Sequence, residues 1–586
     1  MSDPHLPGIF ASLSSASSGL TGDLGSLPKF GLETIDYAIL VTYLVVVIAI
    51  GFALKRQARS AEGYLLSSRS IPGWITGLAF ISANLGAQEL IGMAASGAEY
   101  GIMTSHFYWV GAIPAMVFLG VFMMPMYYGS KAKSVPDYLK MRYDERTRTF
   151  NSYSFAVMTV FSSGISMHAL ADLLNFLLGW NYHISLLVTS AIVLAYVLKG
   201  GLSSAIYNEV LQFFMIVFGI APLAYLALRD VGGWEGLVAK MSVHNPQAMH
   251  SWAGTGGIDN ALGVPWYGIL FGLGFVLSFG YWCTNFAEVQ RAMAADSMGA
   301  ARRTPIIGAI PKMLFPAIIV LPGMIAFALT QDAVGNGYSI PLKDGALNYN
   351  QTLPSMMFHY FPNGLLGLAM TALMASFMSG MAANVTAFNT VLTYDIYQRG
   401  SKKTDAELLR MGKLATIIGI FLAVGCAYVA ANYNNIMSIL QLVFGFVNAP
   451  LFATFLLGMF TRRSNHSGSF WGLVIGTSSA VVFHGLSLAS GNAPGIKGAW
   501  LSPVFEFPKE LSQSFWVAIV AFSVTFIINL GISIVTGHRR TDDELRGLVY
   551  SLTPHDRTST DKWYARPAIL GAIVIVACLI LNLIFW

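Results

Sequence analysis

Charged side chains are scarce in this sequence, because Asp, Glu, Lys and Arg together make up only 11% of its 586 residues. Soluble domains carry roughly a quarter of such residues, so a chain of soluble domains is excluded. Hydrophobic residues account for 55% of the sequence, and they gather in runs long enough to cross a bilayer. The sequence therefore predicts an all-α polytopic membrane protein folded as one large helical bundle.

Cysteine is scarce as well, and the histidines do not cluster. Cys283, Cys426 and Cys578 all lie in apolar segments and are odd in number, so we expect three reduced thiols and no disulfide framework. The eleven histidines are scattered, and no His/Asp/Glu set has the spacing of metal ligands. A membrane-embedded enzyme would need paired carboxylates or a metal cluster, so we expect neither an enzyme nor a cofactor.

The N-terminal residues differ from the rest of the chain. Residues 1–34 are rich in Ser and Gly and lack a basic start before an apolar core, which predicts a disordered extracytoplasmic tail and no cleaved signal peptide. Residues 35–586 then form a single transmembrane domain. About fourteen apolar runs approach spanning length: Asp36–Leu54, Ile71–Ser96, Phe107–Tyr128, Phe150–Leu178, His183–Leu198, Ser204–Leu228, Pro265–Asn285, Thr304–Thr330, Leu365–Tyr397, Leu414–Ala431, Ile436–Phe460, Ser469–Ser490, Ser514–Val535 and Pro567–Phe585.

Lys and Arg fall in alternate loops between these runs. The loops that separate the basic clusters carry few such residues, whereas the clusters themselves lie at 55–69, 131–148, 291–303, 399–410, 462–463 and 539–546. Because cytoplasmic loops are enriched in Lys and Arg, we expect a multi-pass protein of the cell membrane with both termini outside. The net charge of +5 thus reflects basic residues that set the topology, and it does not indicate nucleic-acid binding. Outside, we expect short helices at Trp234–Met241 and Leu353–Phe361.

The second apolar run contains an unusual stretch, FISANLGAQELIG at Phe80–Gly92. Polar groups at membrane depth are costly unless they face protein or a water-filled cavity. Helices that break at the midplane are how secondary transporters hold ions and solutes, although small residues also allow close helix packing. The residues that favour a break here are Ser82, Asn84, Gly86, Gln88 and Glu89.

Two further charged residues lie inside predicted spans. Lys312 stands in the eighth run, where a lysine either snorkels to the interface or meets hydroxyls or a carboxylate in a wet cavity. Glu209 stands near the start of the sixth run. It would attract a departing cation, or it would cap a helix or form a salt bridge near the cytoplasmic interface.

The seventh run holds Ser278, Gly280, Tyr281 and Trp282 together. Tyr and Trp are typical of an aromatic belt at the membrane interface. With Gly280 beside them they also suit a second helix break, where their rings stack on a ring-shaped solute. Gln441, early in the eleventh run, would bond a solute or a neighbouring helix.

The ninth run carries Ser376, Ser379 and Gly380. Hydroxyl and carbonyl oxygens suit a hard cation such as Na⁺, although small residues also permit close packing. Breaks in the second and seventh runs lie five spans apart, which is the expected sign of two inverted five-helix repeats, at about 71–228 and 265–460, with the site between them.

Several longer motifs resemble one known family. They are SANLGAQELIGMAASG at 82–97, GGLSSAIYNEVLQ at 200–212, VQRAMAA at 289–295, TYDIY at 393–397 and FLLGMF at 455–460. In this order they resemble the sodium:solute symporters, and among them the sodium/sugar cotransporters, over nearly the whole chain. The resemblance implies a LeuT-like core of two inverted five-helix repeats, with one helix before the core and three after it.

The resemblance also implies a sodium site between the first and eighth core helices. Its ligands would be backbone oxygens of Ser82, Leu85 and Ser376 and the hydroxyl of Ser379. The family usually has a second hydroxyl residue next, where this chain has Gly380. That departure leaves three alternatives, namely a loosely bound ion, a water as the missing ligand, or a proton in place of sodium.

The sugar site of the family is matched in part. By resemblance, Asn84, Lys312 and Gln441 stand at sugar-binding positions, and Tyr281 stands at the tyrosine that closes the inner gate, followed by Trp282.

Other positions depart from the family pattern. Glu89 replaces a glutamine or histidine, Tyr108 a sugar-binding glutamate, Gly111 a serine and Ser278 an asparagine, whereas Glu209 matches the acidic residue on the sodium exit path. We therefore count Glu89, Tyr108 and Ser278 among the solute-binding candidates.

These features together predict a symporter that couples inward sodium flow to uptake of a small polyhydroxylated solute, above all a sugar, by alternating access. Its expected partners are the solute, sodium and membrane lipid, with no nucleic acid and no obligate protein partner. A symporter of the same fold for an amino acid, a carboxylate or another nutrient, with sodium or proton coupling, remains the alternative.

Overall fold

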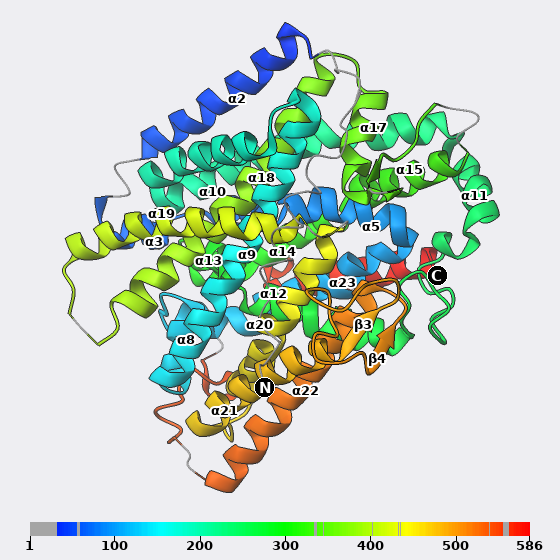
Figure 1. The fold of residues 1–586 in the computed structure, drawn as a ribbon. Coiled ribbons are helices and arrows are strands. Elements are labelled where there is room, and N and C mark those ends of the chain that lie inside the picture. Colours follow the sequence, from blue (N-terminus) through cyan, green and yellow to red (C-terminus); the bar gives the residue numbers. More distant parts are fainter. Residues whose placement is uncertain are drawn as a thin grey trace, which may run out of the picture.

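The computed structural model describes residues 32–54, 59–332, 337–343, 345–400, 402–431, 433, 435–537, 540–554 and 562–586. The predicted tail, residues 1–34, lies outside the described residues except for its last three positions. The described chain is almost entirely helical (Figure 1). Its strands form two small pairs, β1 (Leu342–Lys343) antiparallel to β2 (Ala346–Leu347) and β3 (Ser487–Ala489) parallel to β4 (Phe505–Phe507).

The long helices follow the apolar runs of the sequence. They are α2 (Thr34–Ala53), α9 (Glu145–Leu178), α10 (Tyr182–Asp230), α18 (Leu365–Thr390), α19 (Asp405–Ala430), α20 (Ile436–Phe460), α21 (His466–Gly485), α22 (Glu510–Thr536) and α23 (Pro567–Ile584), of which α10 is kinked at Gly201. Two further spans combine α-helical and π-helical turns. They are Phe107–Gly129, with α6 (Ile113–Phe118) and α7 (Met124–Gly129), and Met298–Gln331, with α14 (Met298–Lys312) and α15 (Leu321–Gln331).

Short helices connect the spans. They are α3 (Ala61–Leu66), α8 (Val135–Arg142), α11 (Gly233–His244) and α17 (Thr352–Tyr360), with single 3₁₀ turns at Ser67–Arg69, Pro246–Met249, Tyr349–Gln351, Tyr550–Leu552 and Trp563–Ala565. The short helices expected at Trp234–Met241 and Leu353–Phe361 are present as α11 and α17, although five residues of α17 are buried, so it is not a surface helix.

The polytopic architecture predicted from composition is confirmed. By length and composition, ten helices of the described chain can cross a membrane, or up to twelve if each of two bent pairs is one span. The predicted fifth run forms only a shorter apolar helix, Tyr182–Ala195, which joins the next span within α10 through a kink at Gly201. The exact count of fourteen spans therefore stays a prediction.

Both predicted helix breaks exist. In the first, α4 (Gly73–Asn84) meets the segment Gln88–Ser105 at 59°. That segment comprises the π-helical turn Gln88–Gly92, α5 (Met93–Tyr100) and a 3₁₀ turn at Gly101–Ser105. In the second, Gly268–Thr284, which ends in α12 (Phe279–Thr284), meets α13 (Phe286–Met293) at 49°. The first break falls at Gly86 as expected.

The predicted position of the second break, Gly280, is wrong. The chain bends at Asn285, whose backbone is extended and whose Oδ1 accepts a hydrogen bond of 3.0 Å from the Ala287 N–H to begin α13. Gly280 lies inside α12, where a Cβ would stand only 3.0 Å from the carbonyl oxygen of Asn448 on α20. The glycine thus serves close helix packing, and the asparagine cap makes the bend.

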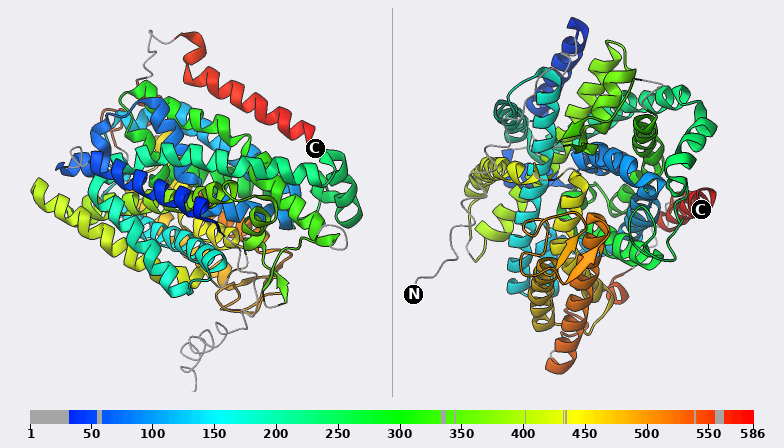
Figure 2. Two further views of the ribbon diagram at one scale, coloured as in Figure 1. Left: turned by 90° about the horizontal axis from the view of Figure 1, so that it is seen from above. Right: turned by 45° about the vertical axis from the view of Figure 1, so that its right-hand side comes forward.

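The broken helices lie inside the bundle. α4 packs against α10, α13, α14 and α18, and α12 packs against α20. α2 lies on the outside against α10 and α18 (Figure 1), and α23 runs along the edge of the molecule against α14 (Figure 2).

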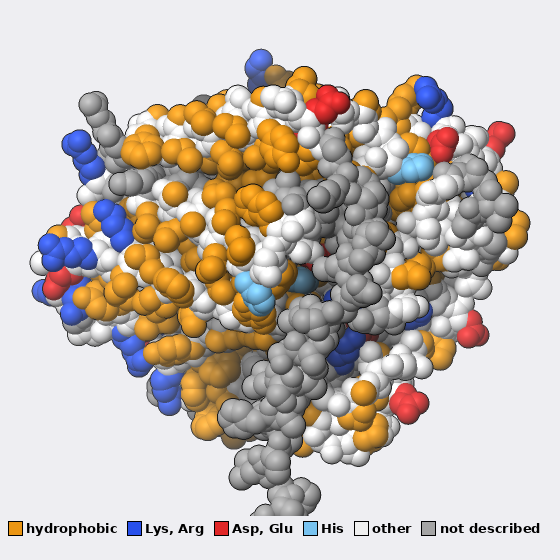
Figure 3. Space-filling model, turned by 45° about the horizontal axis from the view of Figure 1, so that its top comes forward, with side chains coloured by type: hydrophobic (Ala, Val, Ile, Leu, Met, Phe, Trp, Pro, Cys, Tyr) orange, Lys and Arg blue, Asp and Glu red, His pale blue; other side chains and the backbone are white. Residues whose placement is uncertain are grey.

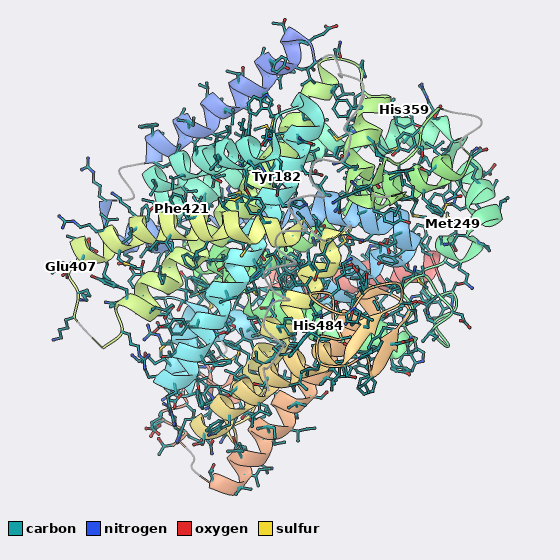
Figure 4. All side chains as sticks on the ribbon, viewed as in Figure 1. Tyr182, Met249, His359, Glu407, Phe421 and His484 are labelled. Carbon is teal, nitrogen blue, oxygen red and sulfur yellow. The ribbon has the colours of Figure 1, made fainter. Side chains whose placement is uncertain are left out.

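Peripheral helices present large apolar side chains outward. Phe421 of α19, Val45 of α2 and Leu583 of α23 are 72%, 60% and 70% exposed. Phe421 lies midway along α19, and Glu407 lies near its start (Figure 4). Hydrophobic side chains cover a broad area of the face in Figure 3, with Lys and Arg at its left margin. Such a surface suits lipid, as expected of a multi-pass membrane protein.

The kink at Gly201 gives a test of the fold. Its φ is +57°, and a Cβ there would lie 2.5 Å from the carbonyl oxygen of Tyr64. We expect Gly201→Ala to destabilise the purified protein by at least the cost of a left-handed residue, about 1–2 kcal/mol, measured as thermal unfolding in detergent. Gly425→Ala is the matched control, because Gly425 is helical with open space around it. Equal melting of the two variants would contradict the assigned kink.

Candidate functional site

The break after α4 frees backbone groups at the centre of the bundle. The Gly86 N–H donates to the carbonyl of Asn84 at 2.7 Å, and the helical pattern resumes where the Glu89 N–H donates to the carbonyl of Gly86 at 3.0 Å. Ser82, Asn84 and Glu89 are 0%, 5% and 2% exposed. A Cβ on Gly86 would lie 3.2 Å from the Cα of Gly380, so the broken segment contacts the backbone of α18 directly.

Lys312 and Glu89 form a buried ion pair. Lys312 Nζ lies 2.9 Å from Glu89 Oε1 and donates to Asn84 Oδ1 at 2.5 Å, and both charged side chains are only 3% exposed. The ammonium also stands 5.0 Å and 5.1 Å from the ring centroids of Tyr108 and Trp282. This geometry excludes the snorkelling alternative for Lys312 and supports the alternative of a carboxylate partner.

Tyr281 connects the two broken helices. Its hydroxyl accepts a hydrogen bond from Asn84 Nδ2 at 3.1 Å and donates to Glu288 Oε1 at 2.6 Å. Its ring centroid lies 4.7 Å from that of Phe444 on α20. Asn84 therefore bridges Lys312 and Tyr281, so one hydrogen-bonded chain runs from Glu89 to Glu288.

A small cavity lies among these side chains. It is lined by all eight residues that the sequence predicted for solute binding, namely Asn84, Glu89, Tyr108, Ser278, Tyr281, Trp282, Lys312 and Gln441. The cavity measures about 50 Å³, far below the roughly 300–1,000 Å³ of typical small-molecule sites. The structure is therefore a closed state, in which a solute enters only if these side chains separate.

Two departures from the family pattern lie against each other in space. A Cβ on Gly111 would lie only 2.2 Å from Ser278 Oγ, and that hydroxyl donates to the carbonyl of Leu273 at 2.8 Å. Ser278 therefore occupies the space that a side chain at 111 would need. Gln441 Nε2 contacts the sulfur of Met437 at 3.1 Å, which leaves its amide oxygen for other partners.

The candidate sodium residues also come together, between the break and α18. Ser376 Oγ donates to the Leu85 carbonyl at 2.5 Å, and Ser379 Oγ donates to the Ser82 carbonyl at 2.9 Å. The hydroxyls of Ser82 and Ser379 are 3.4 Å apart. Gly380 lies beside them with its backbone against Gly86. Across the described residues no cluster of three or more His, Cys, Asp or Glu side chains could hold a metal, so the candidate ligands are hydroxyl and carbonyl oxygens.

Glu209 lies in a closed ion pair. Arg291 binds both of its carboxylate oxygens, at 2.5 Å and 3.2 Å, and both side chains are fully buried. Arg291 also donates to the carbonyl of Ala287 at 2.7 Å. This geometry supports the salt-bridge alternative for Glu209, and its place on a sodium exit path stays a prediction.

Sequence reasoning missed Glu288. It is 1% exposed, and its Oε2 has no hydrogen-bond partner among the residues that the structure describes. The prediction ended the seventh span at Asn285 and so treated Glu288 as part of a loop. The signal that would have found it is the spacing of Glu288 and Arg291, which puts two charges on one helical face beside an apolar run.

Comparison with known proteins places the chain among transporters. The model of the sodium:solute symporter family matches residues 64–476. The sodium/glucose cotransporter 4 of Danio rerio is 30% identical over 478 residues, which cover 76% of this chain and 71% of that protein. The sodium/mannose cotransporter of Bos taurus is 30% identical, covering 77% of this chain and 78% of that protein. The sodium/glucose cotransporter of Vibrio parahaemolyticus is 26% identical, covering 76% and 84%.

A solved structure shares the fold. The substrate-bound outward-open state of a Na⁺-coupled sialic acid symporter superposes with a TM-score of 0.72 over 86% of this chain and 98% of that one, at 19% sequence identity.

The buried ion pair gives a direct test of the site. Lys312→Met leaves the Glu89 carboxylate unpaired, and breaking a buried pair in this way costs about 3–5 kcal/mol. We expect the double variant Glu89→Gln with Lys312→Met to recover most of that loss, because both charges are gone. Thermal unfolding of the purified single and double variants measures the coupling. Additive losses in the double variant would contradict the pairing.

Proposed function

Because this chain belongs to the sodium:solute symporter family, we propose that it is a sodium-coupled secondary active symporter that imports a small polyhydroxylated solute of the sugar class by alternating access. The observation that carries the proposal is the convergence of all eight candidate solute residues on one buried cavity. The sugar class is supported by relatives described as sodium/glucose and sodium/mannose cotransporters.

Coupling would arise because ion and solute use the same broken segment. The backbone oxygens of Ser82 and Leu85 lie next to the side chain of Asn84, which faces the cavity. An ion bound to those oxygens would fix the segment against α18 and so fix Asn84 and Glu89. If the ion favours the outward-open conformation and the solute binds that conformation better, the ion raises the affinity for the solute, and linkage makes the effect reciprocal.

The chemistry of the cavity favours a neutral, hydroxyl-rich solute over an anion. Glu89 neutralises Lys312 in the closed state, so the ammonium group is already paired and is not available to bind the carboxylate of an anionic solute. As the site opens, solute hydroxyls could replace both partners, since each hydroxyl donates and accepts. Sites built to hydrogen-bond hydroxyls strongly reject solutes that lack them. Tyr281 and Trp282 offer ring faces for the apolar side of a sugar.

The alternative cargo is an amino acid, a carboxylate or another nutrient, in which case Lys312 would leave Glu89 for an anionic group. A specific observation keeps proton coupling as the second candidate for the driving ion, namely that Gly380 brings no hydroxyl to the oxygen cluster.

The finer topology belongs to the proposal too. We propose fourteen spans across the cell membrane, with both termini extracytoplasmic and inverted core repeats at about 71–228 and 265–460. The two bends, one in each proposed repeat, support this arrangement. We propose no obligate protein partner.

Uptake into proteoliposomes tests the function. We expect an inward sodium gradient to drive accumulation of at least one labelled sugar or polyol from a panel. Unlabelled sugars should compete with this uptake, whereas carboxylates and amino acids should not. When radioactive sodium is added outside the same vesicles, we expect it to enter only when the transported solute is also present outside. If an amino acid or carboxylate drives sodium entry and no sugar does, the proposed cargo is wrong. If no sodium enters with any solute, the coupling is wrong.

The gate gives a second prediction. Tyr281→Phe removes the hydroxyl that joins Asn84 to Glu288, so the inner side would open without solute. We expect the steady-state accumulation ratio to fall several-fold while sodium leaks inward without solute.

Tyr127→Phe is the matched control, because Tyr127 is a buried tyrosine whose hydroxyl donates to the Cys283 carbonyl at 3.0 Å, and it is not among the residues that line the cavity. Equal accumulation by the two variants would remove Tyr281 from the gate.

A further inference from the structure

One buried hydroxyl beside the candidate sodium residues has no hydrogen-bond partner among the described residues. Ser166 of α9 is fully buried, and its Oγ has no hydrogen-bond partner within the described part of the chain. That Oγ lies 3.4 Å from the position of a Cβ on Gly380. Burying a hydroxyl without a hydrogen-bond partner costs folding free energy, so the orientation of the Ser166 hydroxyl needs an explanation.

The helix itself would have offered Ser166 a partner. Serine and threonine inside helices commonly donate to the carbonyl four residues back, and other hydroxyls of α9 do so. Ser152 Oγ donates to the Arg148 carbonyl at 2.8 Å, and Thr159 Oγ1 donates to the Phe155 carbonyl at 3.1 Å. Ser166 instead directs its hydroxyl toward α18.

A side chain at position 380 would crowd the broken segment. A Cβ on Gly380 would lie 3.0 Å from the Cα of Gly86, which is backbone and yields only if the broken segment moves. The close contact of these two glycines brings the carbonyls of Ser82 and Leu85 up to α18. Because position 380 is a glycine and carries no oxygen of its own side chain, the nearby hydroxyl on this side of the cluster is that of Ser166 on α9.

We propose that Ser166 Oγ is a ligand of the coupling sodium ion and takes the place that Gly380 leaves empty. The ion would then be held by three elements, namely the break after α4, the serines of α18, and α9. This inference rests on the proposed sodium coupling and deepens it.

The chemistry of the cluster suits this assignment. Hard cations take neutral and anionic oxygens as ligands. The hydroxyls of Ser376 and Ser379 now donate their hydrogens to the Leu85 and Ser82 carbonyls. On ion binding these hydroxyls rotate, and both carbonyls and hydroxyl lone pairs turn to the ion. Ser166 needs no such exchange, because its hydroxyl forms no hydrogen bond with any residue that the structure describes.

Sodium binding to the purified full-length protein tests the assignment without a known solute. Radioactive sodium is titrated by scintillation proximity at constant ionic strength, with choline as the replacement cation. We expect the sodium concentration for half-saturation to rise about ten-fold in both Ser166→Ala and Ser166→Cys, in line with losses of metal affinity when ligand geometry is disturbed. The cysteine keeps the buried volume and so preserves folding, but sulfur is a poor ligand for a hard cation.

Ser152→Ala is the matched control, because it removes a buried hydroxyl from the same helix that is already bonded within it. It should bind sodium like the wild type. Wild-type sodium affinity in both Ser166 variants overturns the assignment and leaves sodium coupling intact. A wild-type protein without saturable sodium binding overturns the assignment and the proposed coupling together.

Discussion

The structure depends on one constraint, which is that a carboxylate and an ammonium at the centre of an apolar bundle must satisfy each other. Glu89 and Lys312 are both nearly fully buried and lie 2.9 Å apart. An unpaired charge at that depth would cost several kcal/mol, so the segment that carries Glu89 has to face α14. That requirement orients the broken helix, and the broken helix in turn places Asn84 between Lys312 and Tyr281.

The same segment explains how two sites can act together. The backbone oxygens of Ser82 and Leu85 face α18, while the side chains of Asn84 and Glu89 face the cavity. The closed cavity measures only about 50 Å³, well below the roughly 300–1,000 Å³ of typical small-molecule sites, so the solute-binding state differs from this one by a rearrangement of the same residues. A ligand shifts such an equilibrium only by its differential affinity for the two states. Because both ligands contact this one segment, each of them shifts the same conformational equilibrium.

Much of this could be predicted from the sequence. Polar residues in an apolar run predicted the break at Gly86, and for Lys312 the sequence left two alternatives, snorkelling or a partner inside the bundle, because the bilayer penalises polar groups at that depth. The position of the second break could not be predicted from Gly280, since only the structure shows that this glycine packs against Asn448 and that Asn285 caps α13. The pairing of Glu209 with Arg291 joins residues 82 positions apart, and the approach of Ser166 to Gly380 depends on how α9 packs against α18. Contacts of this kind are set by tertiary packing, of which a single sequence carries no local sign.

The central claim is that one broken segment serves both the cation and the solute. Equilibrium binding of radioactive sodium to the purified protein, measured without and with a saturating transported solute, tests it most directly. The account predicts that the solute tightens sodium binding, and that sodium tightens solute binding by the same factor, as linkage requires. Sodium affinity that is identical with and without solute would contradict the account.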